Sequence, residues 1–192
     1  VLQKELPAAA QAVTSSNRQI IARLGSSGDT EYLYVLNADV QNEQSALISA
    51  RTRGGYAYDL FGGNTAVWAA LEGVLKLQAS VPAGRWRVYA ITPAPLGGVT
   101  LAVKEEQGQV TVEAAVVDQG QQAVVGAFPI RLTVADARGQ ALPYGGYFGT
   151  EGGRLEHSFR TAVNDPAGLW KITATNLTTG QTAEAEFTRA GR

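Results

Sequence analysis

The chain has 192 residues, of which 45% are hydrophobic and 17% charged, and its formal net charge is −1. This composition predicts packed cores and excludes a disordered segment, and the length suits one large domain or two of roughly 90–100 residues. Acidic and basic residues are interspersed, which excludes the basic face that nucleic-acid-binding proteins carry. The absence of cysteine excludes disulfides, thiolate chemistry and cysteine-based zinc sites, and we expect no cofactor.

The first residues suggest that the chain is part of something longer. Methionine is absent even from position 1, and residues 1–10 lack the basic and apolar regions of a signal peptide. We therefore expect that the chain begins inside a longer precursor or is a processed product, with any signal upstream. No apolar run approaches the roughly 20 residues of a membrane helix, so membrane insertion is not expected. Residues 1–16 are interpreted as a lead-in segment, with a short helical turn after Pro7 and a connector at 14–17.

From Arg18 onward the hydrophobic residues recur with a period of two, which indicates β-strands. Glycine-rich turns are expected at 25–29, 54–55 and 62–64. Residues 65–72 fit a strand or a helical turn, and a strand is favoured. In the first half the expected strands are 18–24, 31–37, 44–50, 56–60, 73–79 and 85–91.

A domain boundary is predicted at 92–98, where two prolines and two glycines favour an extended connector. A short strand at 147–150 is expected between the glycine pairs 145–146 and 152–153. The other expected strands of the second half are 99–104, 109–117, 129–135, 153–161, 169–176 and 182–188. No long helices alternate with these strands. The sequence therefore predicts an all-β fold of two tandem antiparallel β-sandwich domains, at 17–93 and 98–192, with Greek-key connections in the second.

One sequence pattern occurs in both halves. Val81-Pro-Ala-Gly-Arg-Trp-Arg-Val-Tyr-Ala-Ile parallels Asp165-Pro-Ala-Gly-Leu-Trp-Lys-Ile-Thr-Ala-Thr. We expect each Pro-Ala-Gly to form a type I turn that leads into a strand. Because side chains alternate along a strand, Trp86 shares one face with Val88 and Ala90. In the same way Trp170 shares one face with Ile172 and Ala174. The core is the favoured location for both tryptophans.

Two stretches of the second half carry a family pattern. Residues 130–139 read Ile-Arg-Leu-Thr-Val-Ala-Asp-Ala-Arg-Gly, and residues 165–180 continue the repeated motif through Asn-Leu-Thr-Thr-Gly before a final alternating strand. In these residues the chain resembles the bacterial immunoglobulin-like modules of large secreted proteins. The resemblance covers about half of the chain and implies that the second sandwich domain is immunoglobulin-like.

The first half is similar, more loosely, to the all-β accessory domain that follows the catalytic domain of many glycoside hydrolases. The matching segments are Tyr32-Leu-Tyr-Val-Leu-Asn, Tyr58-Asp-Leu-Phe-Gly-Gly, and the strand that leads into Val81-Pro-Ala-Gly. The resemblance implies a place in a longer protein. It implies no activity, because that family's catalytic residues lie in a barrel that these residues do not form.

The residues that catalysis would need show no suitable arrangement in the sequence. His157 is interpreted as a solvent-facing strand residue, because no acidic cluster surrounds it at metal-ligand spacing and no Gly-x-Ser-x-Gly motif would pair it with a serine. Glu105 and Glu106 precede a probable turn, and Asp59 and Asp165 are interpreted as caps of turns. We therefore expect no enzymatic activity.

Aromatic residues in or beside loops are the remaining candidates for a binding site. Exposed aromatic rings stack on sugar rings, and polar neighbours bind the hydroxyl groups. The candidate platform residues are Tyr56, Tyr58, Trp68, Tyr144 and Tyr147.

The favoured function is that of a non-catalytic accessory or spacer pair in a larger secreted, periplasmic or surface protein, of a carbohydrate-active kind. Its expected partner is a neighbouring domain of the same precursor. The first alternative is a carbohydrate-binding module with a glycan as ligand. The second is an adhesion or assembly module that uses the edge of the strand at 182–188.

Overall fold

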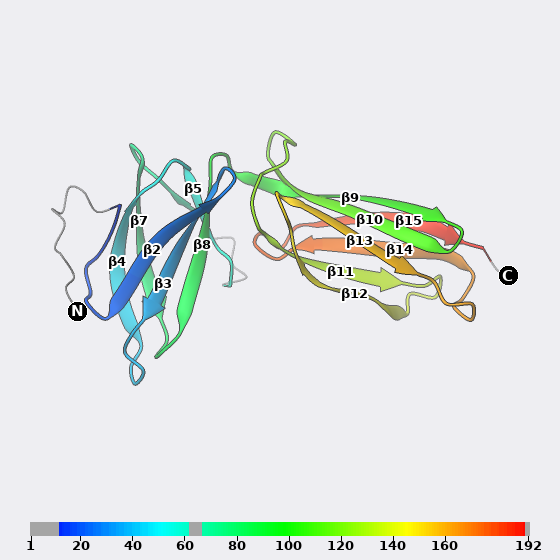
Figure 1. Ribbon diagram of the computed structural model, residues 1–192, viewed down its shortest axis with the longest axis horizontal. Coiled ribbons are helices and arrows are strands. Elements are labelled where there is room, and N and C mark those ends of the chain that lie inside the picture. The colour runs from blue at the N-terminus through cyan, green and yellow to red at the C-terminus, as the bar shows by residue number, and fades with distance from the viewer. Residues whose placement is uncertain (1–11, 62–66, 191–192) are drawn as a thin grey trace. The chain divides into compact units, whose positions relative to one another are not determined.

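The computed structural model describes residues 12–61 and 67–190, and the side chains of Val67 and Trp68 are not described. The described residues form fifteen β-strands and no helix. They divide into two compact units, residues 12–61 with 67–94 and residues 95–190. Each unit is an antiparallel β-sandwich (Figure 1). The all-β fold class is thus as the sequence predicts.

The first unit packs a three-stranded sheet against a five-stranded sheet. Its core holds the inward side chains of both sheets, among them Leu33, Ile48, Leu77 and Ile91. In spatial order the small sheet is β1 (Val13–Ser15), β4 (Gln44–Arg51) and β7 (Val74–Val81). The large sheet is β2 (Ile20–Ser27), β3 (Thr30–Asn37), β8 (Trp86–Thr92), β5 (Tyr56–Asp59) and β6 (Val67–Ala69).

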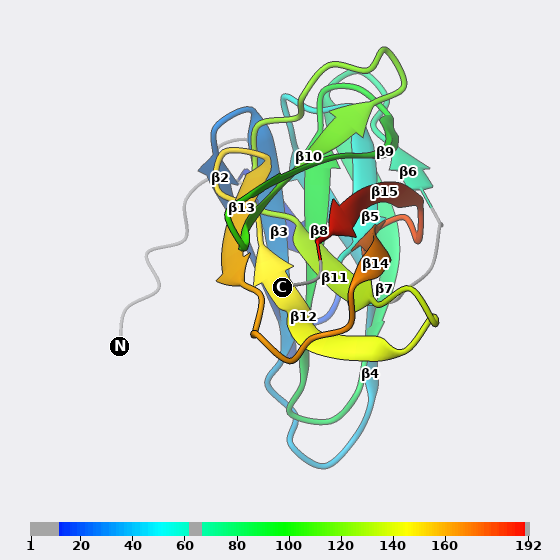
Figure 2. The same ribbon diagram turned by 90° about the vertical axis from the view of Figure 1, so that its right-hand side faces the viewer.

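The second unit packs a three-stranded sheet against a four-stranded sheet, two layers that Figure 2 shows end-on. Val112, Ile130 and Trp170 lie in its core. The first sheet is β13 (Arg154–Arg160), β10 (Gln109–Asp118) and β9 (Leu96–Glu106). The second is β12 (Ala141–Gly149), β11 (Pro129–Ala135), β14 (Gly168–Asn176) and β15 (Thr182–Arg189).

Most strand boundaries agree with the sequence prediction within about two residues, and three regions differ more. Residues 13–15, expected in a lead-in, form β1 and pair with β4, while the helical turn expected after Pro7 lies outside the described residues. β2 continues through Gly25 to Ser27, so its turn is confined to Gly28 and Asp29. β9 begins at Leu96, so the expected connector at 92–98 is reduced to the three residues 93–95.

The largest difference is β12, which is a nine-residue strand where only 147–150 was expected. Gly145 and Gly146 lie inside it, and the pairing of β11 with β12 shifts between Leu132 and Val134. A side chain at Gly145 would collide with the carbonyl oxygen of Leu132. These glycines therefore allow a bulge with close backbone contact rather than a turn.

The two copies of the repeated motif form different turns. Arg85 N–H donates to Pro82 O (3.0 Å), and Gly84 has a φ of 61°, which fits the third position of a type II turn rather than the expected type I. In the second copy Gly168 has a φ of 125°, and the indole N–H of Trp170 donates to Pro166 O (2.9 Å).

Candidate functional site

A row of hydrophobic side chains crosses the outer face of the five-stranded sheet. Ile21 on β2 lies opposite Leu36 on β3, and Leu36 lies opposite Trp86 on β8. The ring of Phe61, just after β5, meets that of Trp86 edge-on at 4.8 Å between centroids. Tyr34 lies two residues before Leu36 on the same side of β3. We call Ile21, Tyr34, Leu36, Phe61 and Trp86 the exposed face; each is 40–59% exposed.

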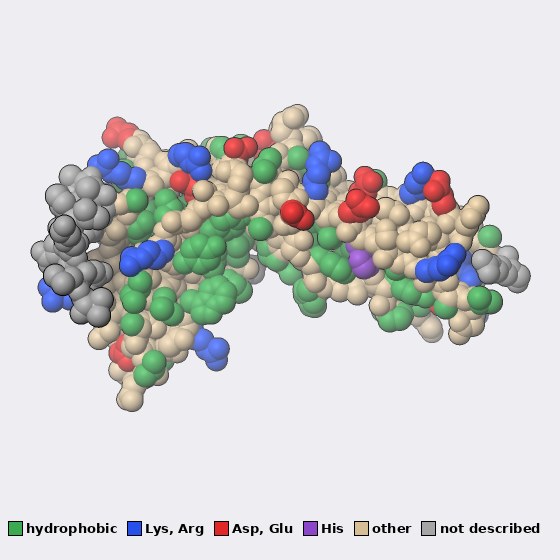
Figure 3. Space-filling view, in the orientation of Figure 1, with side chains coloured by type: hydrophobic (Ala, Val, Ile, Leu, Met, Phe, Trp, Pro, Cys, Tyr) green, Lys and Arg blue, Asp and Glu red, His purple; other side chains and the backbone are tan. Residues whose placement is uncertain are grey.

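The exposed face is contiguous, which separates it from scattered surface hydrophobics. Figure 3 shows hydrophobic side chains gathered over β2, β3 and β8. Single exposed hydrophobic residues are normal on soluble proteins, whereas contiguous patches mark interaction surfaces. From the exposed fractions its area is on the order of several hundred Å², comparable with the largest apolar patch on a typical monomer, about 300–600 Å².

The opposite outer face of the first unit is polar. On β4 and β7 the outward positions are Ser45, Leu47, Ser49, Arg51, Lys76, Gln78 and Ser80. A sheet with one solvated face alternates hydrophobic and polar residues in this way. On β3 and β8, by contrast, hydrophobic residues occupy both faces, as in strands that are covered on both sides.

The sequence itself contains a signal for this face. Residues 32–36 read Tyr-Leu-Tyr-Val-Leu and residues 88–91 read Val-Tyr-Ala-Ile. Both runs are hydrophobic at every position, so a period of two cannot decide which side is inward. Such runs indicate a sheet with a second covered face.

Trp86 lies on this outer side, so its expected place in the core is wrong. Tyr89 and Ile91 are the residues of β8 that enter the core. Val88 and Ala90 share the outer side with Trp86, as expected, and both are buried. Ala90 lies between Tyr32 and Tyr58 in the register, two residues whose large side chains flank it on neighbouring strands.

The three platform candidates of the first unit do not form an exposed aromatic surface among the described side chains. Tyr58 is only 3% exposed, so its ring offers no free face. Tyr56 is partly exposed and pairs with Ala69. Trp68 lies in β6 opposite Ala57, and its side chain is outside the described residues.

Of the two candidates in the second unit, Tyr144 has a structural role and Tyr147 is solvent-exposed. The hydroxyl of Tyr144 donates to Asp165 Oδ2 (2.6 Å), and its ring stacks on Phe159 at 4.6 Å. Burial, followed by the bond to Asp165, raises the pKa of Tyr144. Tyr147 is 75% exposed and lies opposite Arg131.

His157 does not face solvent as expected. It shares the inward side of β13 with Leu155 and Phe159, because it lies opposite the buried Val112. Its Nε2 lies 3.1 Å from Tyr144 O, and its ring lies 4.5 Å from that of Phe148. His157 thus packs at the side of the sandwich. Within residues 12–61 and 67–190 no group of His, Asp and Glu residues could hold a metal ion.

The acidic residues expected at turns are held by turn hydrogen bonds. Asp59 Oδ1 accepts from the N–H of Phe61 (2.9 Å), two residues on, as expected. Asp165 Oδ2 accepts instead from the N–H of Ala162, three residues earlier (2.7 Å). Glu105 Oε1 accepts from the N–H of Gly108 (2.7 Å), and Glu106 pairs with Lys104. Each of these four carboxylates therefore has a hydrogen-bond or ion-pair partner close to it in the sequence.

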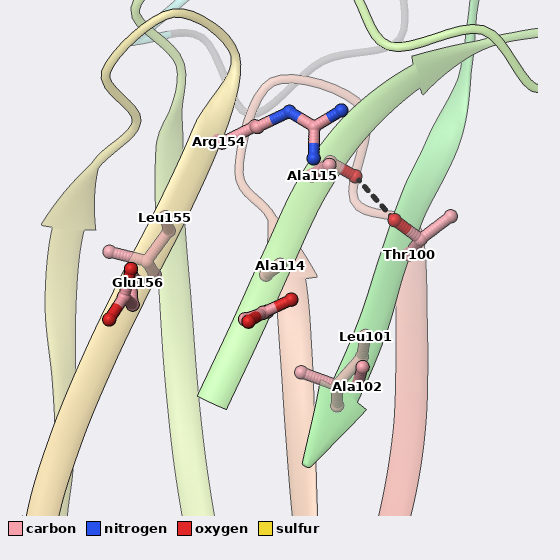
Figure 4. Close-up of a pocket in the computed structure, with 9 residues that line it drawn as sticks. Thr100, Leu101, Ala102, Ala114, Ala115, Arg154, Leu155 and Glu156 are labelled. Carbon is pink, nitrogen blue, oxygen red and sulfur yellow. Dashed lines mark hydrogen bonds between the residues drawn. The ribbon is translucent and has the colours of Figure 1, made fainter. Parts of the chain in front are cut away.

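A shallow hollow of about 340 Å³ lies on the outer face of β9, β10 and β13 (Figure 4). Glu113 and Glu156 lie opposite each other there, and the small side chains Ala102 and Ala115 leave the space between longer neighbours. Thr100 Oγ1 donates to Ala115 O (3.3 Å). Arg154, opposite Ala115, adds a positive charge at one end of the hollow. Two acidic side chains, one arginine and one side-chain-to-backbone bond on an open surface assign no ligand to this hollow.

No protein-family model matches the chain, and a comparison with curated proteins finds no match. Among solved structures, a β-glucuronidase from Ruminococcus gnavus is similar at 10% identity and a TM-score of 0.28, over 84% of this chain and 35% of that one. A β-D-glucuronidase from Dictyoglomus thermophilum is similar at 6% identity and a TM-score of 0.28, over 95% of this chain and 44% of that one. The chain thus spans less than half of either enzyme.

Within the described ranges, no helix is long and apolar enough to cross a membrane.

Proposed function

We propose that the chain is a non-catalytic accessory region of a larger secreted or surface protein of a carbohydrate-active kind, and that the first unit docks a neighbouring domain of that protein. The exposed face is the observation that carries the proposal. This face is apolar, and its strands β3 and β8 carry hydrophobic residues on both sides of the sheet. That composition is typical of strands that are covered on both sides. Docking would remove Ile21, Tyr34, Leu36, Phe61 and Trp86 from water.

The second unit serves as the spacer in this proposal. Its outer faces bear polar and charged residues such as Thr111, Lys171 and Glu184, which suit contact with water. The order of its strands, three in one sheet and four in the other with Greek-key connections, favours an immunoglobulin-like module. Such a unit would set the distance to whatever follows it.

The experiment introduces Leu36→Ser and Trp86→Ser together into the longer polypeptide. Small-angle X-ray scattering then measures the radius of gyration. We expect the radius to increase, because two serines in the centre of the face weaken docking. The matched control, Tyr147→Ser with Leu169→Ser, removes two exposed hydrophobic residues from the second unit and should leave the radius unchanged. An equal radius in the wild type and the Leu36/Trp86 variant contradicts the proposal.

A carbohydrate-binding function is the second candidate, because Tyr34, Phe61 and Trp86 present aromatic rings to solvent. Affinity gels containing cellulose, xylan or chitin test it. Retardation that disappears in Trp86→Ala would favour this function. The aliphatic Ile21 and Leu36 within the same row favour a protein partner, because sugar recognition needs polar groups beside the rings.

A further inference from the structure

One positive charge and no negative charge lies among the strand residues that surround the exposed face on the same side of the sheet. Arg23 lies on β2 opposite Tyr34, two residues from Ile21, and is exposed. Among the described outward positions of β2, β3, β5 and β8, Arg23 is the only charged residue. Its Nη1 donates to Ala22 O (3.1 Å), and it forms no ion pair with any residue in the described part of the chain.

This charge distribution disfavours a second copy of the chain as the occupant. A two-fold interface places the same patch on both sides. Two copies of this face would bring two arginines into one interface and supply no carboxylate for either. A complementary partner offers an acidic residue at that place, since interfaces match opposite potentials.

The area of the face favours a partner on the same polypeptide. A stable complex of separate proteins buries about 800 Å² on each side. The exposed face provides several hundred Å² of apolar surface, which suits the centre of a smaller interface. A tethered domain docks at an effective concentration in the millimolar range, so a small interface is enough.

We infer that the occupant of the exposed face is a domain of the same polypeptide whose apolar surface carries an acidic side chain that pairs with Arg23. This inference rests on the proposed function and adds the chemistry of the partner. The apolar row supplies the contact area, and Arg23 fixes the orientation of the docked domain.

The test places a donor and an acceptor dye on the first unit and on the neighbouring domain of the longer polypeptide, and measures the docked fraction by energy transfer. Arg23→Gln should lower the docking equilibrium constant about two- to fivefold, the range that an exposed ion pair gives. Arg23→Glu should lower the constant further, because the new glutamate would repel the acidic side chain of the partner domain. Arg23→Lys keeps the positive charge and should retain most of the docking. The control Arg154→Glu alters an exposed arginine of the second unit and should have no effect.

Salt and added protein complete the test. The docking equilibrium constants of wild type and Arg23→Gln should converge as the salt concentration rises from 0.05 to about 0.5 M. At the higher concentration the Debye length is below about 5 Å, so the ion pair is screened. The isolated chain, added in trans at about 100 µM, should not displace the tethered domain, because the tether maintains millimolar concentrations. Displacement, or dimerisation of the isolated chain at this concentration in sedimentation, would overturn the inference.

The outcomes separate the inference from the proposed function. Loss of docking in the Leu36→Ser/Trp86→Ser variant, with no effect of Arg23→Glu, overturns the acidic partner and leaves docking in place. No effect of either variant overturns both.

Discussion

Trp86 and Trp170 occupy the same position of a repeated motif but lie on opposite sides of their sheets. Trp86 is 55% exposed, whereas Trp170 is 0% exposed and lies in the core of the second unit. In β14 the alternate positions are Leu169, Lys171, Thr173 and Thr175, mostly polar, so Trp170, Ile172 and Ala174 form the apolar side. In β8 the alternate positions include Tyr89 and Ile91, which fill the core instead. A shift of one residue in a strand exchanges its two faces.

Replacement of these tryptophans by alanine should have unequal effects. We expect Trp170→Ala to lower the free energy of unfolding by about 3–5 kcal/mol, as for large-to-small changes in a core. Trp86→Ala should cost about 1 kcal/mol, because it loses mainly its ring contact with Phe61. Urea denaturation of each variant measures both. Equal costs would contradict the assignment of Trp86 to the surface.

Two adjacent glycines offer a matched pair for a backbone test. Gly152 and Gly153 have φ values of 56° and 81°, in the region that other residues seldom adopt. A Cβ at Gly153 would collide with the carbonyl oxygen of Val124, whereas Gly152 has open space around it. Gly152→Ala should cost about 1–2 kcal/mol, the left-handed penalty alone. Gly153→Ala should cost about 1–3 kcal/mol more. Similar melting temperatures of the two variants would refute the close approach.

The ion pair of Asp59 and Arg87 should matter more than a surface pair. Arg87 Nη1 lies 2.7 Å from Asp59 Oδ2, and the side chain of Asp59 is 9% exposed. Asp59→Asn keeps an oxygen for the turn but removes the charge, so we expect a loss of about 2 kcal/mol, below the full value for a buried pair because Arg87 is partly exposed. The control Glu106→Gln breaks the solvent-exposed pair with Lys104 and should change stability by less than about 0.5 kcal/mol. Chemical denaturation at neutral pH compares the two.

Tyr89 should make the first unit sensitive to alkaline pH. Burial, followed by the charge of Asp59, raises the pKa of Tyr89 from 10.0 to about 12. The folded state therefore keeps the proton that the unfolded state loses, so this stability is present below pH 10 and declines as the pH rises toward 12. Urea denaturation from pH 9 to 12 should show a smaller decline in Tyr89→Phe than in the wild type. Identical declines would show that Tyr89 is not the group responsible.

Much of the strand pattern could be predicted from the sequence, because most strands have one solvent-exposed and one buried face. β11 (Pro129–Ala135) has the expected bounds, and its alternation Ile130, Leu132 and Val134 is inward throughout. β12 was predicted only in part, at 147–150, because its glycine pair resembles a turn. Its pairing with β11 is a long-range contact that a local pattern does not contain.

The exposed face was not among the predicted site residues for a related reason. The selection of platform residues used proximity to loops, which favoured Tyr58 and Tyr144, both of which pack within their units. Sequence proximity to a loop does not report exposure. The consecutive hydrophobic residues of β3 and β8 are the signal for the exposed face, because they place hydrophobic side chains on both sides of the sheet.

Hydroxyl-radical footprinting tests the central claim most directly, because it reports the solvent exposure of individual side chains. The isolated chain and the longer polypeptide are oxidised under the same conditions, and modification is quantified by mass spectrometry. We expect oxidation of Tyr34, Phe61 and Trp86 to fall several-fold in the longer polypeptide, while Tyr147, 75% exposed on the second unit, is modified equally in both. Equal oxidation of Trp86 in the two proteins would contradict docking at this face.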